Sequence, residues 1–532
     1  MNRYTAYEGG RHTALVLAAC TLVLLPTLTF RMGVDQGVFA YMSAALLEGK
    51  WPYVGTWESD FPGLIFLQAV QMLVLGKSIV AFRAFDLGVQ VLSAFLIHRI
   101  ARRTSGWIAA TIAPILFCLI YQGYGPWNTA QREGFGLVFI LAGFWFTLSA
   151  EKRPPLVTAV LAGLGLGVAV TIKPTLLALS LFYLPLVLHL RSRRAWGVAV
   201  AGGAALVLPA AAIVAGYWAT GTLTEIYEAC VAYQAIYTAR LRGDGPLVVY
   251  WLQKLRGLGV NAVVLPVLYA PFLALDGRRQ RERLMLWLAY LGATYAVFVQ
   301  GTFAGYHYLP GLALGAVFVG EIAGTSIEWV MARWHGPKVV GRVPVAVVLV
   351  VLALVPMSAV YLRRAPVGRF LALTFMRPPT PGEFRNHEVF DFTEAYDTAA
   401  YLRARTQPGE PIHVWGYESL VYFLADRPAA TRFQMTHPLV MREPGRPLTP
   451  MQLRWRAEFL ADVTARPPAY VAVVRDDRWW WSPEERSSEE LLDDFPEWRA
   501  IIAARYALER SIGRYLIYRR VPGAGAPSAS AR

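Results

Sequence analysis

Long apolar segments fill the first two thirds of the chain, and they constrain its fold more than any other feature. About 20 apolar residues cross the hydrocarbon core of a bilayer, and spans are predicted near residues 13–30, 84–100, 107–121, 134–150, 156–172, 175–190, 196–218, 257–275, 284–300, 308–330 and 343–361. With 55% hydrophobic and only 16% charged residues, the chain is too apolar for an ordinary soluble protein. The sequence therefore predicts a polytopic α-helical membrane protein with about 11 transmembrane helices.

Clusters of arginine and lysine set the predicted orientation of these helices. They follow every second span, at residues 99–103, 152–153, 191–194, 278–283 and 333–342. Because cytoplasmic loops collect basic residues, we predict a cytoplasmic N-terminus. The net charge of +15 then indicates orientation, and no nucleic-acid partner is expected. The apolar segment at 63–76 is too short to span, so we expect a half-inserted helix on the outer side.

This orientation predicts which parts of the chain face outward. Residues 31–80, 122–132, 219–253 and all residues after 361 share the extracytoplasmic face. We predict a membrane module at 1–361, an extracytoplasmic α/β domain at 362–520 and a disordered tail at 521–532. In the α/β domain, helices are expected at 393–405, 418–425 and 489–505, and strands at 411–415, 469–474 and 506–519. The three cysteines show no spacing typical of a disulfide framework or a zinc site.

A polar stretch at 31–63, between the first span and the apolar remainder, is the first candidate for an active site. It contains Asp35, Glu58 and Asp60, and charge kept at a bilayer surface usually serves chemistry or transport. The alternative for Asp35 is structural, since Asp is a frequent helix N-cap and a helix is expected from about Gln36 to Glu48.

Further polar residues share the predicted outer face. Arg132 and Glu133 either belong to the site or only open the fourth span, where Glu is favourable and Arg is not. Lys173, which precedes Pro174, either contacts a phosphate or snorkels to the interface. His307 and Tyr308 are either functional or part of an interfacial aromatic belt. The run Trp479, Trp480 and Trp481 either rests on the membrane interface or lines a sugar or acceptor surface.

Several short motifs, taken in order, give the chain a resemblance to a known family. They are ALLEGKWPY and FPG in the first outer loop, then NTAQREGFG, TIKPT and YHYLP. This series resembles the bacterial GT-C glycosyltransferases that use polyprenyl-phosphate sugars, the group of protein mannosyltransferases and aminoarabinose transferases. The resemblance implies a polyprenyl-phosphate sugar donor, an active site on the outer face of the bacterial inner membrane, and a catalytic Asp early in the first loop, which only Asp35 matches. In many relatives a Glu follows this Asp and a Lys precedes a Pro-Pro pair, whereas this chain has Gln36 and the run Asp60-Phe61-Pro62.

Physical chemistry suggests a role for each candidate in such a transfer. We predict that Asp35 is the general base for the acceptor hydroxyl, and that Arg132 neutralises the leaving phosphate with Glu133 as its partner or as a metal ligand. Lys173, His307 and Tyr308 are predicted substrate contacts. Glu58, Asp60 and Glu133 carry the oxygen ligands that Mg²⁺ or Mn²⁺ prefers, so a divalent cation is a predicted optional cofactor. The acceptor is a glycan, a lipid or a protein.

Two other classes of function remain open from the sequence. A multi-span transporter or flippase of an envelope substrate would favour inverted repeats and ionisable residues in mid-span, whereas the acids here lie in outer loops. A non-catalytic envelope assembly subunit would tolerate replacement of Asp35, Glu58 and Glu133.

Overall fold

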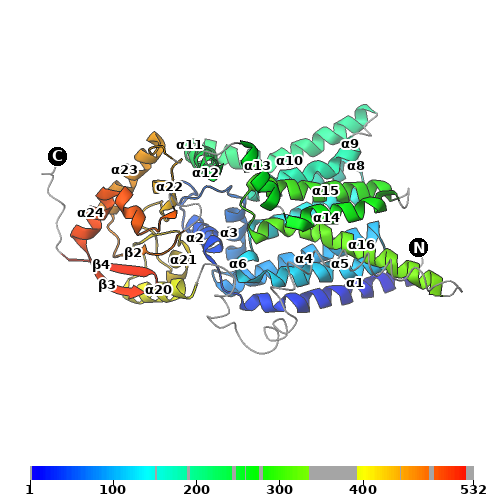
Figure 1. Cartoon of the computed structure of the whole chain (residues 1–532), viewed down its shortest axis with the longest axis horizontal. Helices are drawn as coiled ribbons and strands as arrows, with labels where there is room; N and C mark the ends of the chain where they lie inside the picture. Colours follow the sequence, from blue (N-terminus) through cyan, green and yellow to red (C-terminus); the bar gives the residue numbers. More distant parts are fainter. Residues whose placement is uncertain are drawn as a thin grey trace. The chain divides into compact units, whose positions relative to one another are not determined.

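The protein is described by a computed structural model, which covers residues 3–149, 153–187, 192–242, 247–257, 259–274, 279–334, 392–443, 445–478 and 485–522. These residues form two compact units (Figure 1). The helical unit contains Met1–Arg31, Ser78–Val214 and Val248–Pro379. The sheet unit contains Met32–Lys77, Ala215–Leu247 and Thr380–Arg532, so the first outer loop groups with the C-terminal residues.

The helical unit is built from long helices joined by short connections. Its elements are α1 (Arg3–Leu24), η1 (Leu25–Thr29), α4 (Ile79–Thr104), α5 (Trp107–Gly123), α6 (Gly125–Asn128), α7 (Arg132–Leu148), α8 (Pro155–Ile172), η3 (Pro174–Tyr183), α9 (Leu184–Val187), most of α10 (Arg193–Ala219), α13 (Leu247–Gly257), α14 (Gly259–Tyr269), η5 (Ala270–Ala274), α15 (Gln280–Gln300), η6 (Gly305–Tyr308) and α16 (Leu309–Trp334). Every predicted span before residue 335 therefore falls on helix, and the span predicted at 343–361 lies outside the described residues.

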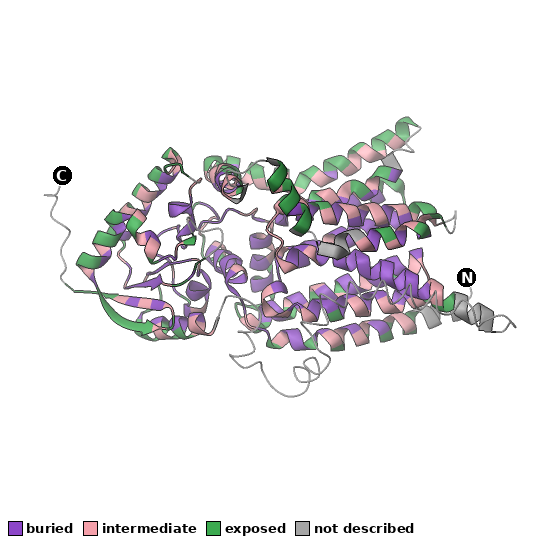
Figure 2. Cartoon of the chain, in the orientation of Figure 1, coloured by how far each residue is buried: buried purple, intermediate pink, exposed green. Residues whose placement is uncertain are grey.

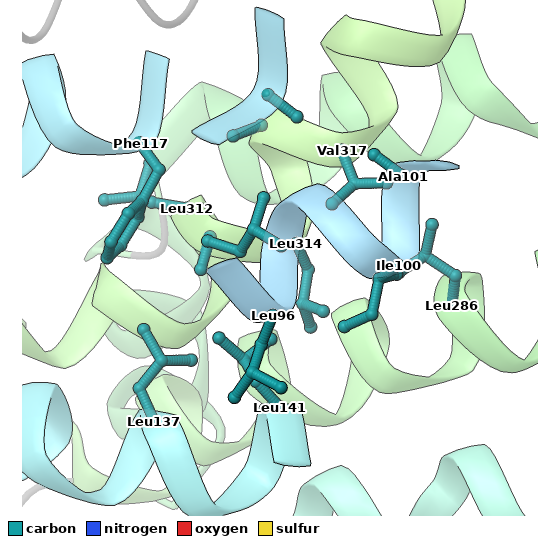
Figure 3. Close-up of a cluster of buried hydrophobic side chains, with 14 of the residues drawn as sticks. Leu96, Ile100, Ala101, Phe117, Leu137, Leu141, Leu286, Leu312, Leu314 and Val317 are labelled. Atoms are coloured by element: carbon teal, nitrogen blue, oxygen red, sulfur yellow. The ribbon is translucent and has the colours of Figure 1, made fainter. Parts of the chain in front are cut away.

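Apolar side chains from most of these helices meet in one core. Figure 3 shows α4, α5, α7, α15 and α16 contributing to it, for example through Leu96, Phe117, Leu141, Leu286 and Val317. The outward faces are apolar too. On α10, Trp196, Val200, Leu208 and Trp218 are exposed, and Figure 2 shows this helix mostly in the exposed and intermediate classes. Apolar residues on both faces are expected of helices that lie in lipid.

Five helices in the described part of the chain are long and apolar enough to cross a membrane: Gly10–Thr29, Ile79–Thr104, Pro155–Ile172, Arg193–Ala219 and Gly305–Glu328. Trp107–Gly123, Pro174–Tyr183 and Val264–Ala274 are apolar but shorter. The predicted span at 175–190 is broken into the 3₁₀ helix η3 and the short α9. Lys173, whose backbone is extended, and Pro174, which cannot continue α8, separate this span from α8.

A buried arginine, Arg83 of α4, joins two distant connections of the helical unit. Its Nε donates to the carbonyl oxygen of Phe30 at 3.2 Å, and its guanidinium also donates to the carbonyl of Arg31. Nη1 donates to Thr129 Oγ1 at 3.1 Å, and Nη2 donates to the carbonyl of Pro126 at 3.0 Å. Residues 30–31, which follow η1, and residues 126–129, which precede α7, therefore meet at one end of the helical unit.

The sheet unit places helices around a small mixed sheet. Its elements are α2 (Val34–Leu47), α3 (Gly63–Leu75), α11 (Leu223–Tyr227), the π-helix η4 (Glu228–Ala232), α12 (Tyr233–Arg242), α20 (Phe392–Arg405), β1 (Ile412–Trp415), α21 (Leu420–Ala425), α22 (His437–Val440), α23 (Pro450–Ala465), β2 (Tyr470–Val474), η8 (Glu490–Asp494), α24 (Pro496–Arg505), β3 (Tyr506–Ile512) and β4 (Tyr515–Arg520). The strand order is β1-β2-β4-β3. Strand β1 pairs with β2 in parallel (Ile412 opposite Tyr470), and β4 pairs with β2 and β3 in antiparallel orientation.

The predicted α/β elements of the C-terminal region are confirmed, with two differences. Pro496 divides the predicted helix at 489–505 into η8 and α24, because its ring fixes a helix start. The sequence analysis missed α22 and α23, although Thr449, Pro450 and Gln452 form a capping box with proline at the first helical position. The run Trp479–Trp481 and the predicted boundary at residues 361 and 362 lie outside the described residues, as does the tail from 523.

The alternative interpretation of Asp35 as a helix N-cap is wrong. Helix α2 begins one residue earlier than Asp35, and its N-cap is Gly33. The side chain of Gln36 accepts a hydrogen bond from the Gly33 backbone N–H at 2.6 Å. Asp35 lies in the first turn of α2, where its charge is favourable without being needed to cap the helix.

Buried charge also holds the C-terminal hairpin in the sheet unit. Arg514, in the turn before β4, donates through Nη2 to Glu418 Oε1 at 2.7 Å, and Glu418 is fully buried. Asp477 accepts from the backbone N–H and from Oγ of Ser488, each at 2.6 Å. Burial raises the pKa of Asp477 to about 7, and burial also raises the pKa of Glu418 despite the nearby guanidinium.

The raised pKa of Asp477 predicts a pH-dependent stability of the sheet unit. The folded state keeps a proton that the unfolded chain releases near pH 4, so this contribution is complete below about pH 4 and is lost as the pH rises through about 7. In Asp477→Asn this dependence should disappear, because the amide can accept from the Ser488 N–H and donate to Oγ. Thermal unfolding of the full chain between pH 4 and 8 measures it.

Asp476→Asn is the control for this prediction, since Asp476 is the exposed neighbour of Asp477. It should keep the wild-type pH profile. An Asp477→Asn profile that matches wild type would contradict the assignment.

Candidate active site

The residues predicted to form the site fall into two groups, one in each unit. Arg132, Glu133, Lys173, His307 and Tyr308 belong to the helical unit. The remaining three, Asp35, Glu58 and Asp60, belong to the sheet unit. Each group is described within its own unit.

In the helical unit the structure brings Glu133, Lys173 and His307 together. Glu133 Oε1 lies 3.2 Å from Lys173 Nζ and 3.7 Å from His307 Nε2. All three residues are buried, with Glu133 only 1% exposed. The three residues lie at the ends of helices: Glu133 in the first turn of α7, Lys173 directly after α8, and His307 in η6 before α16. The alternatives of a snorkelling lysine and an interfacial histidine do not describe such buried, paired side chains.

Two more predicted residues lie around this cluster. Arg132 interacts electrostatically with both Glu133 and His307. Tyr308 is partly buried and packs against Val297 of α15. Glu133 therefore already has a cation partner in Lys173, and Arg132 adds further positive charge to the same place.

Lys254 on α13 is a candidate that the sequence analysis missed. Its side chain is buried, 7% exposed, and Nζ donates to the carbonyl of Val299 at 3.0 Å. Nζ also lies over the Tyr250 ring, 4.5 Å from its centroid. Within the described residues no carboxylate forms an ion pair with Lys254. The signal in the sequence was a lysine four residues after Tyr250 in an apolar helix. Residues at this spacing lie on the same face of a helix, so the lysine can lie over the aromatic ring.

The connection between α15 and α16 links Lys254 to the cluster. Val299 holds Lys254, and the next residue, Gln300, donates to Thr175 Oγ1 at 3.1 Å, two positions after Lys173. Thr302 Oγ1 is 3.2 Å from His307 Nδ1. Gly301 caps α15 in the left-handed conformation (φ 68°) against the Lys254 side chain, where a Cβ would clash.

In the sheet unit the acids are held by their own stretch of chain. Glu58 is buried, 4% exposed, and its Oε1 accepts from the Ser59 backbone N–H at 2.7 Å and from Ser59 Oγ at 3.1 Å. Asp60 is partly buried, and its carbonyl accepts from the Tyr53 hydroxyl at 2.5 Å. Asp35 is also partly buried, at the start of α2.

A metal site for Glu58, Asp60 and Glu133 stays a prediction. Among the described residues, no group of three or more His, Cys, Asp and Glu side chains is arranged to hold a metal ion. The Glu133 carboxylate faces Lys173, and the Glu58 carboxylate binds Ser59. Within the described residues of either unit, these carboxylates are thus held by a cation or by backbone and hydroxyl donors.

The buried pair of Glu133 and Lys173 predicts strong energetic coupling. Glu133→Gln leaves the Lys173 ammonium buried beside a neutral group, which should cost roughly 3–5 kcal/mol. Lys173→Met should cost a similar amount. The double variant should be clearly more stable than the sum of the two losses predicts, because neither charge is then stranded. Thermal unfolding of the four proteins measures this coupling.

The partly exposed pair of Arg103 and Glu282 is the comparison, with Nε to Oε1 at 2.8 Å. Glu282→Gln should cost about 1 kcal/mol or less. Strictly additive effects of Glu133→Gln and Lys173→Met would contradict the pairing.

Comparisons with known proteins place the fold. No family model and no curated protein sequence matches the chain. Among solved structures, ArnT from Cupriavidus metallidurans bound to undecaprenyl phosphate matches with a TM-score of 0.57 and 16% identity, covering 97% of this chain and 99% of ArnT. The archaeal oligosaccharyltransferase AglB from Archaeoglobus fulgidus, in complex with an inhibitory peptide and a dolichol-phosphate, matches with a TM-score of 0.50 and 12% identity, covering 89% of this chain and 70% of AglB. The chain is thus a membrane protein whose fold is similar to that of the GT-C glycosyltransferases.

Proposed function

We propose that the protein is a membrane glycosyltransferase that moves a sugar from a polyprenyl-phosphate donor to an acceptor hydroxyl. The observation that carries the proposal is the buried cluster of Glu133, Lys173 and His307, with Lys254 nearby, in a fold similar to ArnT over almost the whole chain. The similar structure of ArnT is bound to undecaprenyl phosphate, and that of AglB is in complex with a dolichol-phosphate. Both ligands are lipid phosphates, which supports a donor of this class.

The charges of the helical unit suit a phosphate. Arg132, Lys173 and Lys254 bring three positive charges to this region, and Glu133 is the carboxylate that partners Lys173. The excess positive charge lies among apolar helices, where a low dielectric strengthens its attraction for an anion. Lys254, which has no carboxylate in an ion pair within the described residues, is the cation we assign to the phosphate. It replaces the lysine that relatives carry before their Pro-Pro pair.

Asp35 supplies the base in this mechanism. Its carboxylate takes the proton of the acceptor hydroxyl while that oxygen attacks the anomeric carbon of the sugar. The bond from this carbon to the phosphate oxygen breaks, and the polyprenyl phosphate leaves with the bonding electrons. Lys254 and Arg132 stabilise the negative charge that grows on the phosphate. We place the reaction on the outer face of the bacterial inner membrane, with the N-terminus in the cytoplasm.

Asp35→Asn tests the base. The variant should fold like wild type, because Gln36 and Gly33 begin the helix without Asp35, and its transfer rate should fall by about 10²–10⁴. The measurement is transfer of sugar from polyprenyl-phosphate donors in proteoliposomes. Glu48→Gln at the exposed end of the same helix is the control and should keep full activity.

Normal transfer by Asp35→Asn would remove Asp35 from the mechanism. Movement of a lipid-linked substrate across the proteoliposome membrane, with no transfer by the wild-type protein, would favour the transporter instead.

Lys254→Met tests the phosphate contact. Binding of polyprenyl phosphate to the purified protein should weaken about tenfold, since one charge-assisted contact is lost. Arg256→Met removes an exposed charge from the same helix and should leave the affinity within twofold of wild type. Equal losses in both variants would indicate a general effect of charge rather than a contact at Lys254.

A further inference from the structure

The first outer loop is held in place by side chains that come much later in the sequence. The hydroxyl of Tyr396, on α20, accepts a hydrogen bond from the Met32 backbone N–H at 2.8 Å and donates one to the Met32 carbonyl at 3.2 Å. Met32 lies three residues before Asp35. One phenol thus binds both backbone groups of Met32, the residue before the N-cap of α2.

The far end of the loop is held in a similar way by Gln434. This side chain is fully buried; its Oε1 accepts from the Trp57 N–H at 2.9 Å, and its Nε2 donates to the Trp57 carbonyl at 2.6 Å. Trp57 directly precedes Glu58. An amide that pairs with both groups of one peptide residue fixes its orientation as well as its position.

Helix α2 itself is packed against the C-terminal residues. A Cβ added to Gly37 would lie 2.6 Å from the Cα of Leu420, so α2 and α21 touch backbone to backbone at this point. One turn later, the Tyr41 hydroxyl accepts from the Ala429 N–H at 2.8 Å. The helix that carries Asp35 therefore has little freedom to rotate or slide.

The middle of the loop has the same kind of support. Arg432 Nη1 donates to the Tyr53 carbonyl at 2.6 Å, and its other nitrogens pair with both carboxylate oxygens of Glu458 at 2.6 and 2.8 Å. Gln234 donates to the Ser59 carbonyl at 3.1 Å. Buried loop carbonyls need such partners, and those of Met32, Tyr53 and Trp57 find them in residues beyond 390.

We propose that Tyr396 and Gln434 are positioning residues for the glycosyl transfer, and that the C-terminal α/β domain acts as the rigid frame for Asp35 and Glu58. The inference rests on the proposed function for its catalytic meaning. Its physical basis is that Asp35 lies in the first turn of α2 and Glu58 in the irregular stretch that follows this helix. A base at such a position stays within a fraction of an ångström of its productive geometry only when the backbone around it is tied down. One clamp binds the backbone of Met32, three residues before Asp35, and the other binds the backbone of Trp57, the residue before Glu58.

The test compares Tyr396→Phe with Tyr401→Phe in the full-length protein. Both changes remove one phenol hydroxyl from α20, but Tyr401 donates to Glu509 on the sheet and does not contact the first loop. Hydrogen–deuterium exchange should become faster at residues 31–40 in Tyr396→Phe only. In the transfer assay its kcat should fall about tenfold, with KM for the donor unchanged.

Gln434→Glu tests the second clamp through its pH profile. An ionised Glu accepts from the Trp57 N–H but repels the Trp57 carbonyl, whereas a protonated Glu can donate to it as Gln does. Burial raises the pKa of such a carboxyl. The ratio of variant to wild-type kcat should therefore rise as the pH falls. The rate of exchange at residues 51–60, taken relative to wild type at the same pH, should fall in parallel.

Unchanged exchange and unchanged kcat in Tyr396→Phe, or equal changes in Tyr396→Phe and Tyr401→Phe, would overturn the proposal. A Gln434→Glu ratio that does not vary with pH would remove the second clamp. If wild type transfers no sugar while exchange at 31–40 rises only in Tyr396→Phe, the clamp is supported and the proposed function is the part that fails.

Discussion

The hydrogen bonds of the buried Arg83 guanidinium are the interactions on which the arrangement of the helical unit most depends. A charged group inside an apolar bundle is tolerated only if polar partners surround it, and here the partners are backbone carbonyls and one hydroxyl from two connections far apart in sequence. The requirement brings Phe30 next to Pro126 and Thr129. One of these connections leads into the Asp35 loop, and the other leads into Arg132 and Glu133. A single solvation requirement thus holds the residues before both connections at the same end of the helical unit.

The same principle explains why the chemistry gathers at helix ends. In the middle of a span the backbone has no spare hydrogen-bonding groups, and a charge there has few partners. At the ends of α7, α8 and α15, free carbonyls, turns and a left-handed glycine make room for Lys173, Lys254 and their partners. Glu133 and Lys173 form an ion pair at 3.2 Å, while Nζ of Lys254 lies against the Val299 carbonyl and the Tyr250 ring.

Sequence reasoning predicted elements well where the signal is local. Apolar runs marked the helices of the membrane module, and alternation with turn residues marked β1, β2 and the β3–β4 pair. It failed where a signal was present but not used, as in the capping box that opens α23. It also failed at the start of α2, where the N-cap is Gly33 and not Asp35. Lys254 was overlooked because a lysine in an amphipathic helix is usually solvated, and only burial distinguishes this one.

By itself the sequence determined that this is a membrane protein with many helices, a C-terminal α/β region and polar residues in the connections between its apolar segments, because hydrophobic length and periodicity are properties of contiguous residues. Only the tertiary structure decided which of those polar residues meet. The contact of Glu133 with Lys173 and His307 joins the ends of helices that are separate in the sequence. The hydrogen bonds of Tyr396 and Gln434 to the first loop join residues more than 360 positions apart. Such contacts depend on how helices pack and on which buried groups need partners, and the local sequence determines neither.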